Sequence, residues 1–344
     1  MPSELSSSSA TRAMRRVAAL AIFGLCLALA ACGDDDEAGD SAQTSTAAES
    51  AYPVTIRSKH GSATIAQRPA RVVTLDNQAT DDALALGVVP VGMAEVTYVP
   101  GGIQSWTKQA LGKERPKLIN LDTAVPYEQV AGLRPDLILA TNTYALEEKA
   151  AYDRVSRIAP TVHFADGSLS DSWQDVTRRV GQALGQEDRA TQLVAEAESD
   201  IAAVRERTPE FENKTVNFFN ADPSGVYTIN DPQDFAIRFL AELGLRLPPS
   251  VVALKGESGR AVVSAERYDV LDSDLLIGTA VTAPALTKLG RDTLFKRIDA
   301  VDDGHYVPLA IGPATSMVSP SLLSVRYATK EVVPKLEAAI KADD

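Results

Sequence analysis

Cysteine and histidine, the residues best suited to metal binding and nucleophilic chemistry, are few in this sequence. The two cysteines, Cys26 and Cys32, lie within or directly after one apolar stretch near the N-terminus. The rest of the chain can therefore form neither a disulfide framework nor a cysteine-ligated zinc site. His60, His163 and His305 are far apart, and none belongs to a His-x-x-x-His pair. A zinc or manganese site built on several imidazoles is not expected.

The motifs of nucleotide-binding and hydrolytic enzymes are also missing. No Gly-x-Gly-x-x-Gly follows a predicted strand, and the sequence contains no Gly-x-x-x-x-Gly-Lys-Ser/Thr and no Gly-x-Ser-x-Gly. An enzyme would need a nucleophile or paired carboxylates across a cleft, and no motif indicates them. Nucleotide-binding and hydrolytic functions therefore lose their usual support, and we predict no catalytic residue, bound metal or cofactor.

The N-terminus has the pattern of a bacterial lipoprotein signal. Three arginines between positions 12 and 16 precede an apolar run, 17–31, which is too short to span a bilayer comfortably. The run ends in Leu29-Ala30-Ala31-Cys32, which resembles the lipobox, whose cysteine is lipidated and becomes the mature N-terminus. Residues 1–31 are predicted to be the signal peptide and Cys32 the lipidation site, which would anchor the protein on the extracytoplasmic face of the cell membrane.

The charge balance limits the partners of the protein. The 344 residues carry 34 Lys and Arg against 46 Asp and Glu, a net charge of -12. Nucleic-acid binding is not expected, because it requires a basic surface. Residues 32–51 begin with acidic residues and continue with Ala, Ser, Thr and Gln without apolar periodicity, so we predict a disordered tether there.

The elements that would position a binding site alternate between strand and helix. The first half of the mature chain is predicted to contain strands at 71–75, 88–93, 136–141 and 161–164 and helices at 82–86, 128–133 and 147–158. This alternation is typical of a parallel sheet covered by helices. We assign residues 52–170 to an N-terminal α/β lobe.

A long helix is predicted next, at 186–207, because its apolar residues recur at helical spacing and Pro209 ends it. It lies in a helical linker, residues 171–208. The alternation of strand and helix then resumes in a C-terminal α/β lobe, residues 209–344, which is predicted to have the same kind of architecture as the first. Its strands are predicted at 214–219, 260–264, 274–278 and 306–309 and its helices at 235–243 and 320–341.

In this order the segments resemble the iron-siderophore substrate-binding proteins of ABC transporters, a class of periplasmic binding proteins with a rigid helix between the lobes. The resemblance covers nearly the whole mature chain. It rests on these segments: 54–56, Gly61, Pro69, 71–75, 83–92, 133–140, 152–153, 158–162, Trp173 and 183–185. It implies an α/β fold with two Rossmann-like lobes joined by one long backbone helix, and a ligand cleft between them.

The resemblance further implies a monomeric receptor that captures a ferric siderophore and delivers it to an ABC permease for iron uptake. In the family, one Glu on each lobe meets Arg residues of the permease. Glu128, before Leu133-Arg134-Pro135-Asp136-Leu137, matches the first, and Glu266, in Val263-Ser264-Ala265-Glu266-Arg267, is the candidate for the second. Each is otherwise an ordinary surface carboxylate.

The ligand-binding residues are expected on loops that follow strands, where open α/β sheets bind ligands. Aromatic side chains there offer flat apolar walls with a polar tip. The candidates are Asn77, Gln78, Tyr98, Trp106, Thr143, Tyr144 and Trp173 in the first part of the chain and Asn220, Tyr227, Arg260, Thr279 and Ser316 in the second lobe. For Trp173, packing between lobe and linker is at least as favoured as ligand contact.

The type of siderophore is predicted from charge. A triply anionic catecholate complex would need several converging cations, whereas a neutral ferric hydroxamate needs mainly aromatic residues and hydrogen-bond donors. Loops of the second lobe offer few cations besides Arg238 and Arg260, so a hydroxamate is favoured. A haem or cobalamin receptor, with Tyr98, Tyr144 or His163 as an axial haem ligand, a surface-anchored enzyme and an adhesive protein remain alternatives.

Overall fold

The computed structural model describes residues 51–167, 170–222 and 224–342, which form two α/β lobes, each built on a five-stranded sheet. The predicted signal peptide, the lipidation site Cys32 and nearly all of the predicted tether lie outside the described residues. Across the part of the chain that is described, no helix is both long enough and apolar enough to cross a membrane.

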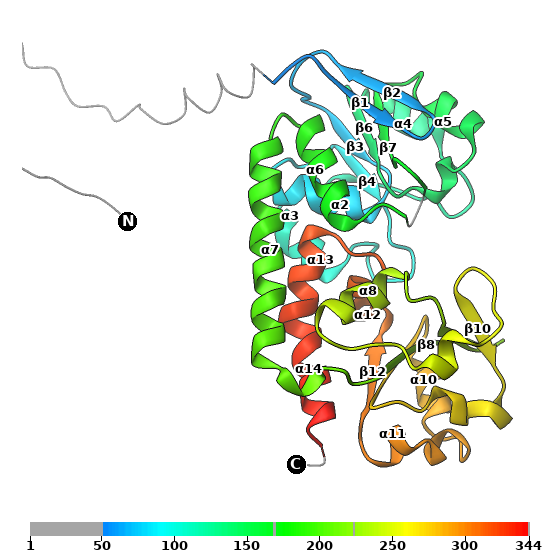
Figure 1. The fold of residues 1–344 in the computed structure, drawn as a ribbon. Helices are drawn as coiled ribbons and strands as arrows, with labels where there is room; N and C mark the ends of the chain where they lie inside the picture. Colours follow the sequence, from blue (N-terminus) through cyan, green and yellow to red (C-terminus); the bar gives the residue numbers. More distant parts are fainter. Residues whose placement is uncertain (1–50, 168–169, 223, 343–344) are drawn as a thin grey trace, which may run out of the picture. The chain divides into compact units, whose positions relative to one another are not determined.

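The first lobe begins with a β-hairpin and continues as a parallel α/β unit (Figure 1). Its elements are β1 (Val54–Ser58), β2 (Gly61–Ile65), β3 (Val72–Thr74), α2 (Asn77–Ala85), β4 (Gly92–Ala94), α3 (Ser105–Leu111), β5 (Lys117–Ile119), α4 (Tyr127–Gly132), β6 (Leu137–Ala140), η1 (Tyr144–Leu146), α5 (Lys149–Val155) and β7 (Thr161–His163). The sheet order is β5-β4-β3-β6-β7. All four pairings are parallel, as the alternation predicted.

The parallel arrangement decides where binding residues lie in this lobe. The central strands β3 and β6 are buried on both faces, which is why they read as continuous apolar runs. Because all five strands run in the same direction, the loops that follow β3, β5 and β6 lie at one edge of the sheet. The loops before these strands, including Arg134 and Asp136, lie at the opposite edge.

A helical hairpin connects the lobes. It consists of α6 (Trp173–Ala183) and α7 (Glu187–Arg207), and α7 coincides with the helix predicted at 186–207. The predicted apolar face of α7, from Ala190 to Val204, is buried. Gly181 permits the close packing of the two helices, because a Cβ there would lie 2.3 Å from Cβ of Ala190. In Figure 1, α7 runs alongside both lobes.

The second lobe differs from the first in its sheet. Its elements are η2 (Pro209–Phe211), β8 (Val216–Asp222), β9 (Gly225–Ile229), α8 (Phe235–Glu242), α9 (Pro249–Val252), β10 (Arg260–Val263), η3 (Ala265–Leu271), β11 (Leu275–Ala280), α10 (Ala283–Leu289), η4 (Phe295–Arg297), α11 (Asp299–Asp302), β12 (Tyr306–Ala310), α12 (Ile311–Val318), α13 (Leu322–Tyr327), η5 (Ala328–Val332) and α14 (Val333–Ile340). The order is β10-β9-β8-β11-β12, and β8, β11 and β12 are parallel.

The antiparallel strand β9 was not predicted, and the second lobe therefore does not simply repeat the first. A short turn after Asp222 returns the chain directly beside β8, so no helix separates β8 from β9. β10 then pairs with β9, again antiparallel. The mixed sheet exposes part of one face near its edge, where Val262 of β10 is 68% exposed.

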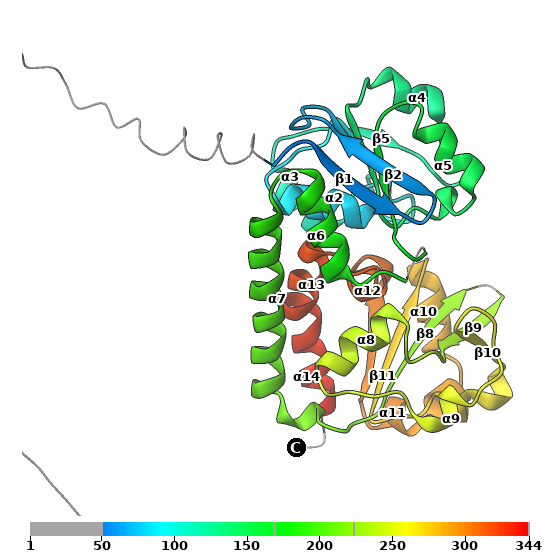
Figure 2. The same ribbon diagram turned by 45° about the horizontal axis from the view of Figure 1, so that its top comes forward.

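The C-terminal helix predicted at 320–341 is interrupted and returns to the first lobe. A π-helical turn, η5, separates α13 from α14, and Pro334 at the start of α14 has no N–H to continue the α-helical bonding. At the start of α13, Ser321 Oγ donates to Asp81 Oδ2 at 2.6 Å and the backbone N–H of Leu322 donates to Asp82 Oδ1 at 3.0 Å. Figure 2 shows α13 beneath the first lobe, so this helix holds the two lobes together.

Candidate functional site

The first lobe has a pocket of about 490 Å³ at the carboxyl-terminal edge of its sheet. The loops after β3, β5 and β6 form it, in agreement with the rule that open parallel sheets bind ligands at this edge. Its lining comprises Leu75, Asp76, Leu121, Asp122, Thr123, Asn142, Thr143, Tyr144, Ala145, Glu147 and Glu148. Four of these residues carry carboxylates, and none of the lining residues is Lys or Arg.

Asp76 fixes one wall of this pocket. Its carboxylate accepts hydrogen bonds from the backbone N–H groups of Ala79 at 2.7 Å and Asn142 at 2.9 Å and from Thr143 Oγ1 at 3.0 Å. Burial raises the pKa of Asp76, although these hydrogen bonds oppose the rise. The contacts tie α2 to the loop after β6. Thr143 also donates to the carbonyl of Leu75, so its hydroxyl is engaged within the protein.

The predicted residues around Asp76 have different exposures. Tyr144 is 79% exposed at the pocket, whereas Thr143 is buried. Gln78, in the first turn of α2, is buried, and its Nε2 has no hydrogen-bond partner among the residues that the structure describes. Asn77 is the half-buried first residue of the same helix. Sequence reasoning selected Thr143 and Tyr144 but missed Asp76, although its position as the helix cap after a strand could have indicated it.

Tyr98 lies where the two lobes meet. Burial raises the pKa of its hydroxyl, while hydrogen bonding to Thr315 of α12 and to Gln104 lowers it. Its ring is 38% exposed. Gln104 itself is buried, and its Nε2 has no hydrogen-bond partner in the described part of the chain. The predicted residue Ser316, next to Thr315, is fully buried and donates to the carbonyl of Pro313.

Three predicted residues of the second lobe form a row across its sheet. Asn220 of β8 pairs in register with Tyr227 of β9 on one side and with Thr279 of β11 on the other. Register partners point to the same face of a sheet, so these side chains share one surface. Asn220 Oδ1 and Thr279 Oγ1 are buried without a hydrogen-bond partner in the protein. Both therefore have hydrogen-bonding capacity that nothing else in the described chain uses.

A second pocket of about 430 Å³ lies beside α8 and the start of β10. Arg260, a predicted residue, lines it together with Asp231, Asp234, Arg238 and Ser170, the last residue assigned to the first lobe. The guanidinium of Arg260 donates to Asp234 Oδ2 at 2.7 Å. The positive charge of Arg260 is therefore already paired with a carboxylate, and Asp231 is a further acid among the lining residues.

The two predicted tryptophans are buried away from these pockets. Trp106 donates from Nε1 to Asp81 Oδ2 at 2.7 Å, and its ring lies 4.8 Å from that of Tyr327. It borders a separate groove between α3 and α13. Trp173 is 5% exposed within the main hydrophobic core. The packing alternative considered for Trp173 is thus the arrangement observed in the structure.

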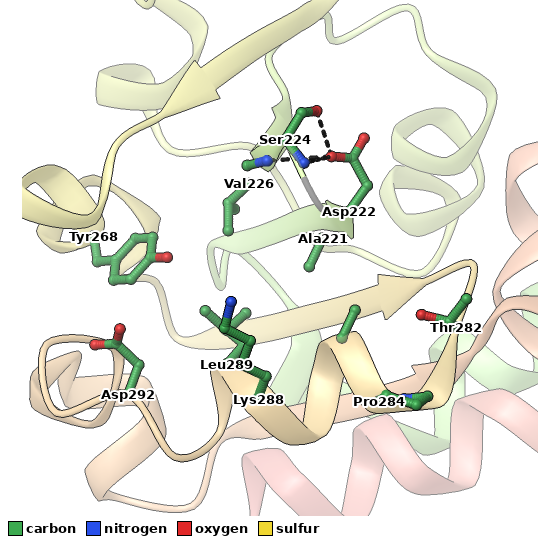
Figure 3. A pocket seen from close by; sticks show the side chains of 12 residues that line it. Ala221, Asp222, Ser224, Val226, Tyr268, Thr282, Pro284, Lys288, Leu289 and Asp292 are labelled. Carbon is green, nitrogen blue, oxygen red and sulfur yellow. Dashed lines mark hydrogen bonds between the residues drawn. The ribbon is translucent and has the colours of Figure 1, made fainter.

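A third pocket lies on the other face of the second lobe (Figure 3). Tyr268, Lys288 and Asp292 surround an apolar floor that includes Leu289, and its volume is about 460 Å³. Asp222, at one end, accepts hydrogen bonds from Ser224 N and Oγ. None of the twelve predicted ligand residues lines it.

The candidate docking residues lie on the surface of different lobes. Glu128 is exposed in the first turn of α4, and Glu266 is exposed in the first turn of η3. Hydrogen bonding to its own backbone and to Ser264 lowers the pKa of Glu266, which favours a charged carboxylate.

The geometry of His163 bears on the haem alternative. This side chain is fully buried, and its Nδ1 and Nε2 lie 2.8 and 3.1 Å from the backbone oxygens of Ala140 and Leu146. Neither nitrogen is accessible to an iron atom, so His163 is not an axial ligand in this conformation. Within residues 51–167, 170–222 and 224–342, no group of three or more His, Cys, Asp or Glu side chains is arranged to hold a metal ion.

The chain is similar to known solute-binding proteins over most of its length. The family model described as "Periplasmic binding protein" matches residues 72–309. The chain is 28% identical to the Bacillus subtilis protein named "Probable siderophore-binding lipoprotein YfiY", over 69% of this chain and 72% of that protein.

Two crystal structures support the same relationship. A periplasmic solute-binding protein of Mycobacterium smegmatis is 27% identical, with a TM-score of 0.73 over 83% of this chain and 98% of that one. The iron-uptake substrate-binding protein PiaA of Streptococcus pneumoniae, solved in complex with ferrichrome, is 26% identical, with a TM-score of 0.69 over 84% of this chain and 99% of that one.

Proposed function

Because the chain belongs to the periplasmic binding protein family, whose members bind solutes and do not catalyse reactions, we propose that it captures a ferric siderophore of the hydroxamate type and delivers it to an ABC permease. The ligand lies between the carboxyl-terminal edge of the first sheet and the exposed face of the second. In this proposal, Tyr144, which lines the pocket of the first lobe, forms the wall on one side, and the row of Tyr227, Asn220 and Thr279 forms the wall on the side of the second lobe.

The distribution of charged residues in the two pockets is the reason that we propose a hydroxamate as the ligand. The pocket of the first lobe contains four acidic residues and no Lys or Arg among its lining. The pocket of the second lobe contains Arg238 and Arg260 against Asp231 and Asp234, with Arg260 bonded to Asp234. A triply anionic ferric catecholate would bring its charge toward these carboxylates. A neutral or cationic ferric hydroxamate avoids that repulsion.

The available hydrogen-bonding groups suit an uncharged chelate as well. Gln78 Nε2 is a donor without a partner, and the Thr279 hydroxyl can donate or accept. Hydroxamate oxygens bound to iron can accept such bonds. The amide groups of a siderophore backbone can both accept and donate them. One relative is named for siderophore binding and one was solved with ferrichrome, while others are named for ferric citrate and ferric enterobactin. The relatives therefore support a ferric chelate as the ligand, and the choice of a hydroxamate rests on the pockets alone.

Delivery would use one carboxylate on each lobe. Glu128 and Glu266 are the proposed contacts to arginines of the permease, and both are exposed. The helix α7 and the contact of α13 with α2 limit the movement of the lobes, so we expect a small hinge motion on binding.

The proposed location is the extracytoplasmic face of the cell membrane, with Cys32 as the lipid anchor. The sequence Leu29-Ala30-Ala31-Cys32 motivates this assignment, and these residues lie outside the described part of the chain. Cys32→Ala should move the protein from the membrane fraction to the soluble fraction. Retention of the variant in washed membranes would contradict the anchor.

Ligand binding is tested by isothermal titration of the chain from Gly33 onward, which lacks the lipidation site. The panel comprises ferrichrome, ferrioxamine B, a ferric tris-catecholate, ferric citrate, hemin and cobalamin, with iron-free chelators as controls. We expect saturable binding of a ferric hydroxamate at submicromolar concentration and at least tenfold weaker binding of the catecholate, roughly 1.4 kcal/mol. Preferential binding of hemin or of the catecholate would overturn the proposed ligand class.

A further inference from the structure

The loop that carries Tyr144 is held at both ends. At its start, Asp76 accepts hydrogen bonds from Asn142 and Thr143. At the end of the loop, residues of the turn between β1 and β2 contact both the backbone and the side chain of Glu147. Lys59 Nζ lies 2.7 Å from Glu147 Oε1, and His60 Nε2 lies 2.7 Å from the Glu147 carbonyl. The exposed ring of Tyr144 lies between these two attachments.

His163 makes the third contact at the end of this loop. Its Nε2 lies 3.1 Å from the carbonyl oxygen of Leu146, while its Nδ1 lies 2.8 Å from the carbonyl oxygen of Ala140. A neutral imidazole has a single N–H and can donate to only one of these oxygens. The shorter contact to Ala140 takes that proton, which leaves the Nε2 lone pair facing Leu146. A protonated imidazole donates to both carbonyls.

We propose that His60 and His163 are positioning residues that hold the Tyr144 loop in its ligand-binding place, and that a proton on His163 strengthens this hold. The inference rests on the proposed function, in which Tyr144 forms a wall of the siderophore site. A Tyr144 loop that is already fixed by hydrogen bonds loses less conformational freedom when the chelate binds. The protein with a protonated His163 should therefore bind the chelate more tightly. Neither histidine touches the ligand.

The surroundings of His163 set the pH range of the effect. His60 of the hairpin stacks on it at 5.6 Å, Tyr152 of α5 at 5.5 Å, and the charged pair of Lys59 and Glu147 lies at the loop. Burial lowers the pKa of His163, and the nearby His60 adds to the lowering, while the two carbonyls and Glu147 oppose it. His163 is therefore neutral at pH 7.5 and gains its proton as the pH falls.

The test measures the affinity of the mature chain for ferrichrome and for ferrioxamine B, which have no group that titrates between pH 5.0 and 7.5. The wild type should bind more tightly as the pH falls and His163 gains its proton, by about two to ten times once it is protonated, which is what one gained hydrogen bond supplies. His163→Gln should lose this pH dependence. Asp81, whose pKa burial raises to about 6, also gains a proton as the pH falls, but both proteins contain it, so the difference between their profiles isolates His163.

Lys59→Ala is the matched control, because it removes a contact to the same Glu147 while keeping both histidines. It should keep the wild-type pH profile with a uniformly weaker affinity. His60→Gln, whose amide can still donate to the Glu147 carbonyl, should keep the affinity, whereas His60→Ala should lower it. Equal affinities for these two variants would contradict the role of His60.

A second measurement covers the case in which His163→Gln does not fold. The imidazole resonances of His163 in the wild type should titrate at a higher pH with ferrichrome bound than without, since linkage is reciprocal. An unchanged titration, or an identical profile for wild type and a folded His163→Gln, would overturn the inference while leaving the receptor function intact. Absence of binding to either hydroxamate at every pH would instead overturn the proposed function.

Discussion

The two lobes present their candidate binding residues in different ways. In the first lobe, a fully parallel sheet places them on loops at one edge, and buried or half-buried polar side chains such as Asp76 and His163 hold those loops. In the second lobe, the antiparallel strand β9 leaves part of the sheet face accessible, and Tyr227 and Asn220 project directly from strands.

This difference predicts which lobe is more sensitive to mutation. A residue on a strand is positioned by the backbone ladder, so removal of one neighbour leaves it in place. A residue on a loop depends on a few side-chain hydrogen bonds. We therefore expect substitutions that do not touch the ligand but remove a contact to the binding loops to lower affinity in the first lobe, and substitutions beside the binding residues of the second lobe to leave it nearly unchanged.

The largest expected effect concerns transport, to which both lobes contribute equally. Glu128→Ala combined with Glu266→Ala should reduce iron uptake in cells to background, because each lobe loses its proposed contact to the permease, while ferric chelate affinity stays within about twofold. Uptake of iron-labelled ferrichrome checks this. The single variants serve as mutual controls. A tenfold loss of chelate affinity in the double variant would place these residues at the ligand site instead.

Asp76→Ala should produce the largest loss of affinity among substitutions that act indirectly. It leaves the N–H groups of Ala79 and Asn142 without their acceptor and removes one of the two acceptors of the Thr143 hydroxyl, which costs roughly 2 to 4 kcal/mol of stability and releases the loop of Tyr144. Chemical denaturation and chelate titration measure the two effects.

Asp136→Ala is the matched control for this change. Asp136 accepts from the backbone N–H groups of Ala70 and Arg71, both at 2.8 Å, at the opposite edge of the same sheet. Its loss should lower stability without changing affinity. Equal losses of affinity in the two variants would remove the distinction between the edges.

Stability should depend on pH through the contact between the lobes. Burial raises the pKa of Asp81 to about 6 against an ordinary value of 3.8. The folded state therefore binds this proton more tightly than the unfolded state, and the free energy of unfolding rises as the pH falls from 7 toward 4, by about 2 kcal/mol from this group. Asp81→Asn should be less stable than wild type and should lack this increase.

Urea denaturation at several pH values tests that prediction. Asp175→Asn, at an exposed carboxylate paired with Arg178, is a suitable control and should follow the wild-type pH profile. If the stability of the wild type declines steadily from pH 7 to pH 5 and that of Asp81→Asn declines in parallel, Asp81 stays ionised over this range. That result would contradict the prediction.

The smallest expected effect concerns ligand selection in the second lobe. Asp234→Ser keeps a side chain able to cap α8 but removes the carboxylate bonded to Arg260. The freed guanidinium should raise the affinity for a ferric tris-catecholate about threefold to tenfold and leave that for ferrichrome unchanged. Arg260→Gln, as the control, should not improve catecholate binding. No change in catecholate affinity in Asp234→Ser would place Arg260 outside the ligand site.

The sequence predicted the elements whose patterns are local and strong. The apolar runs of β6 and β11 and the helical spacing of α7 were identified within about two residues. The strand β9 was missed because Gly225-Val-Tyr-Thr-Ile is short and follows a turn directly. The break within the C-terminal helix was also missed, although Pro334 indicates where it occurs.

The candidate site was predictable to a similar degree. The rule that loops after parallel strands bind ligands selected Thr143 and Tyr144, and both line the pocket of the first lobe. The rule takes no account of burial, so it selected buried residues such as Thr143, Trp106 and Ser316 together with the exposed Tyr144. The hydrogen bonds of Asp76 and His163 join residues far apart in the chain, and only the structure places such partners together.

The central claim, that one ferric chelate lies between the two lobes, is tested most directly by a crystal structure of the protein with ferrichrome, using the anomalous scattering of iron to locate the metal. The iron should lie between the ring of Tyr144 and the row of Tyr227, Asn220 and Thr279. An iron position in the pocket of Tyr268 and Lys288 in Figure 3, on the other face of the second lobe, would contradict the claim.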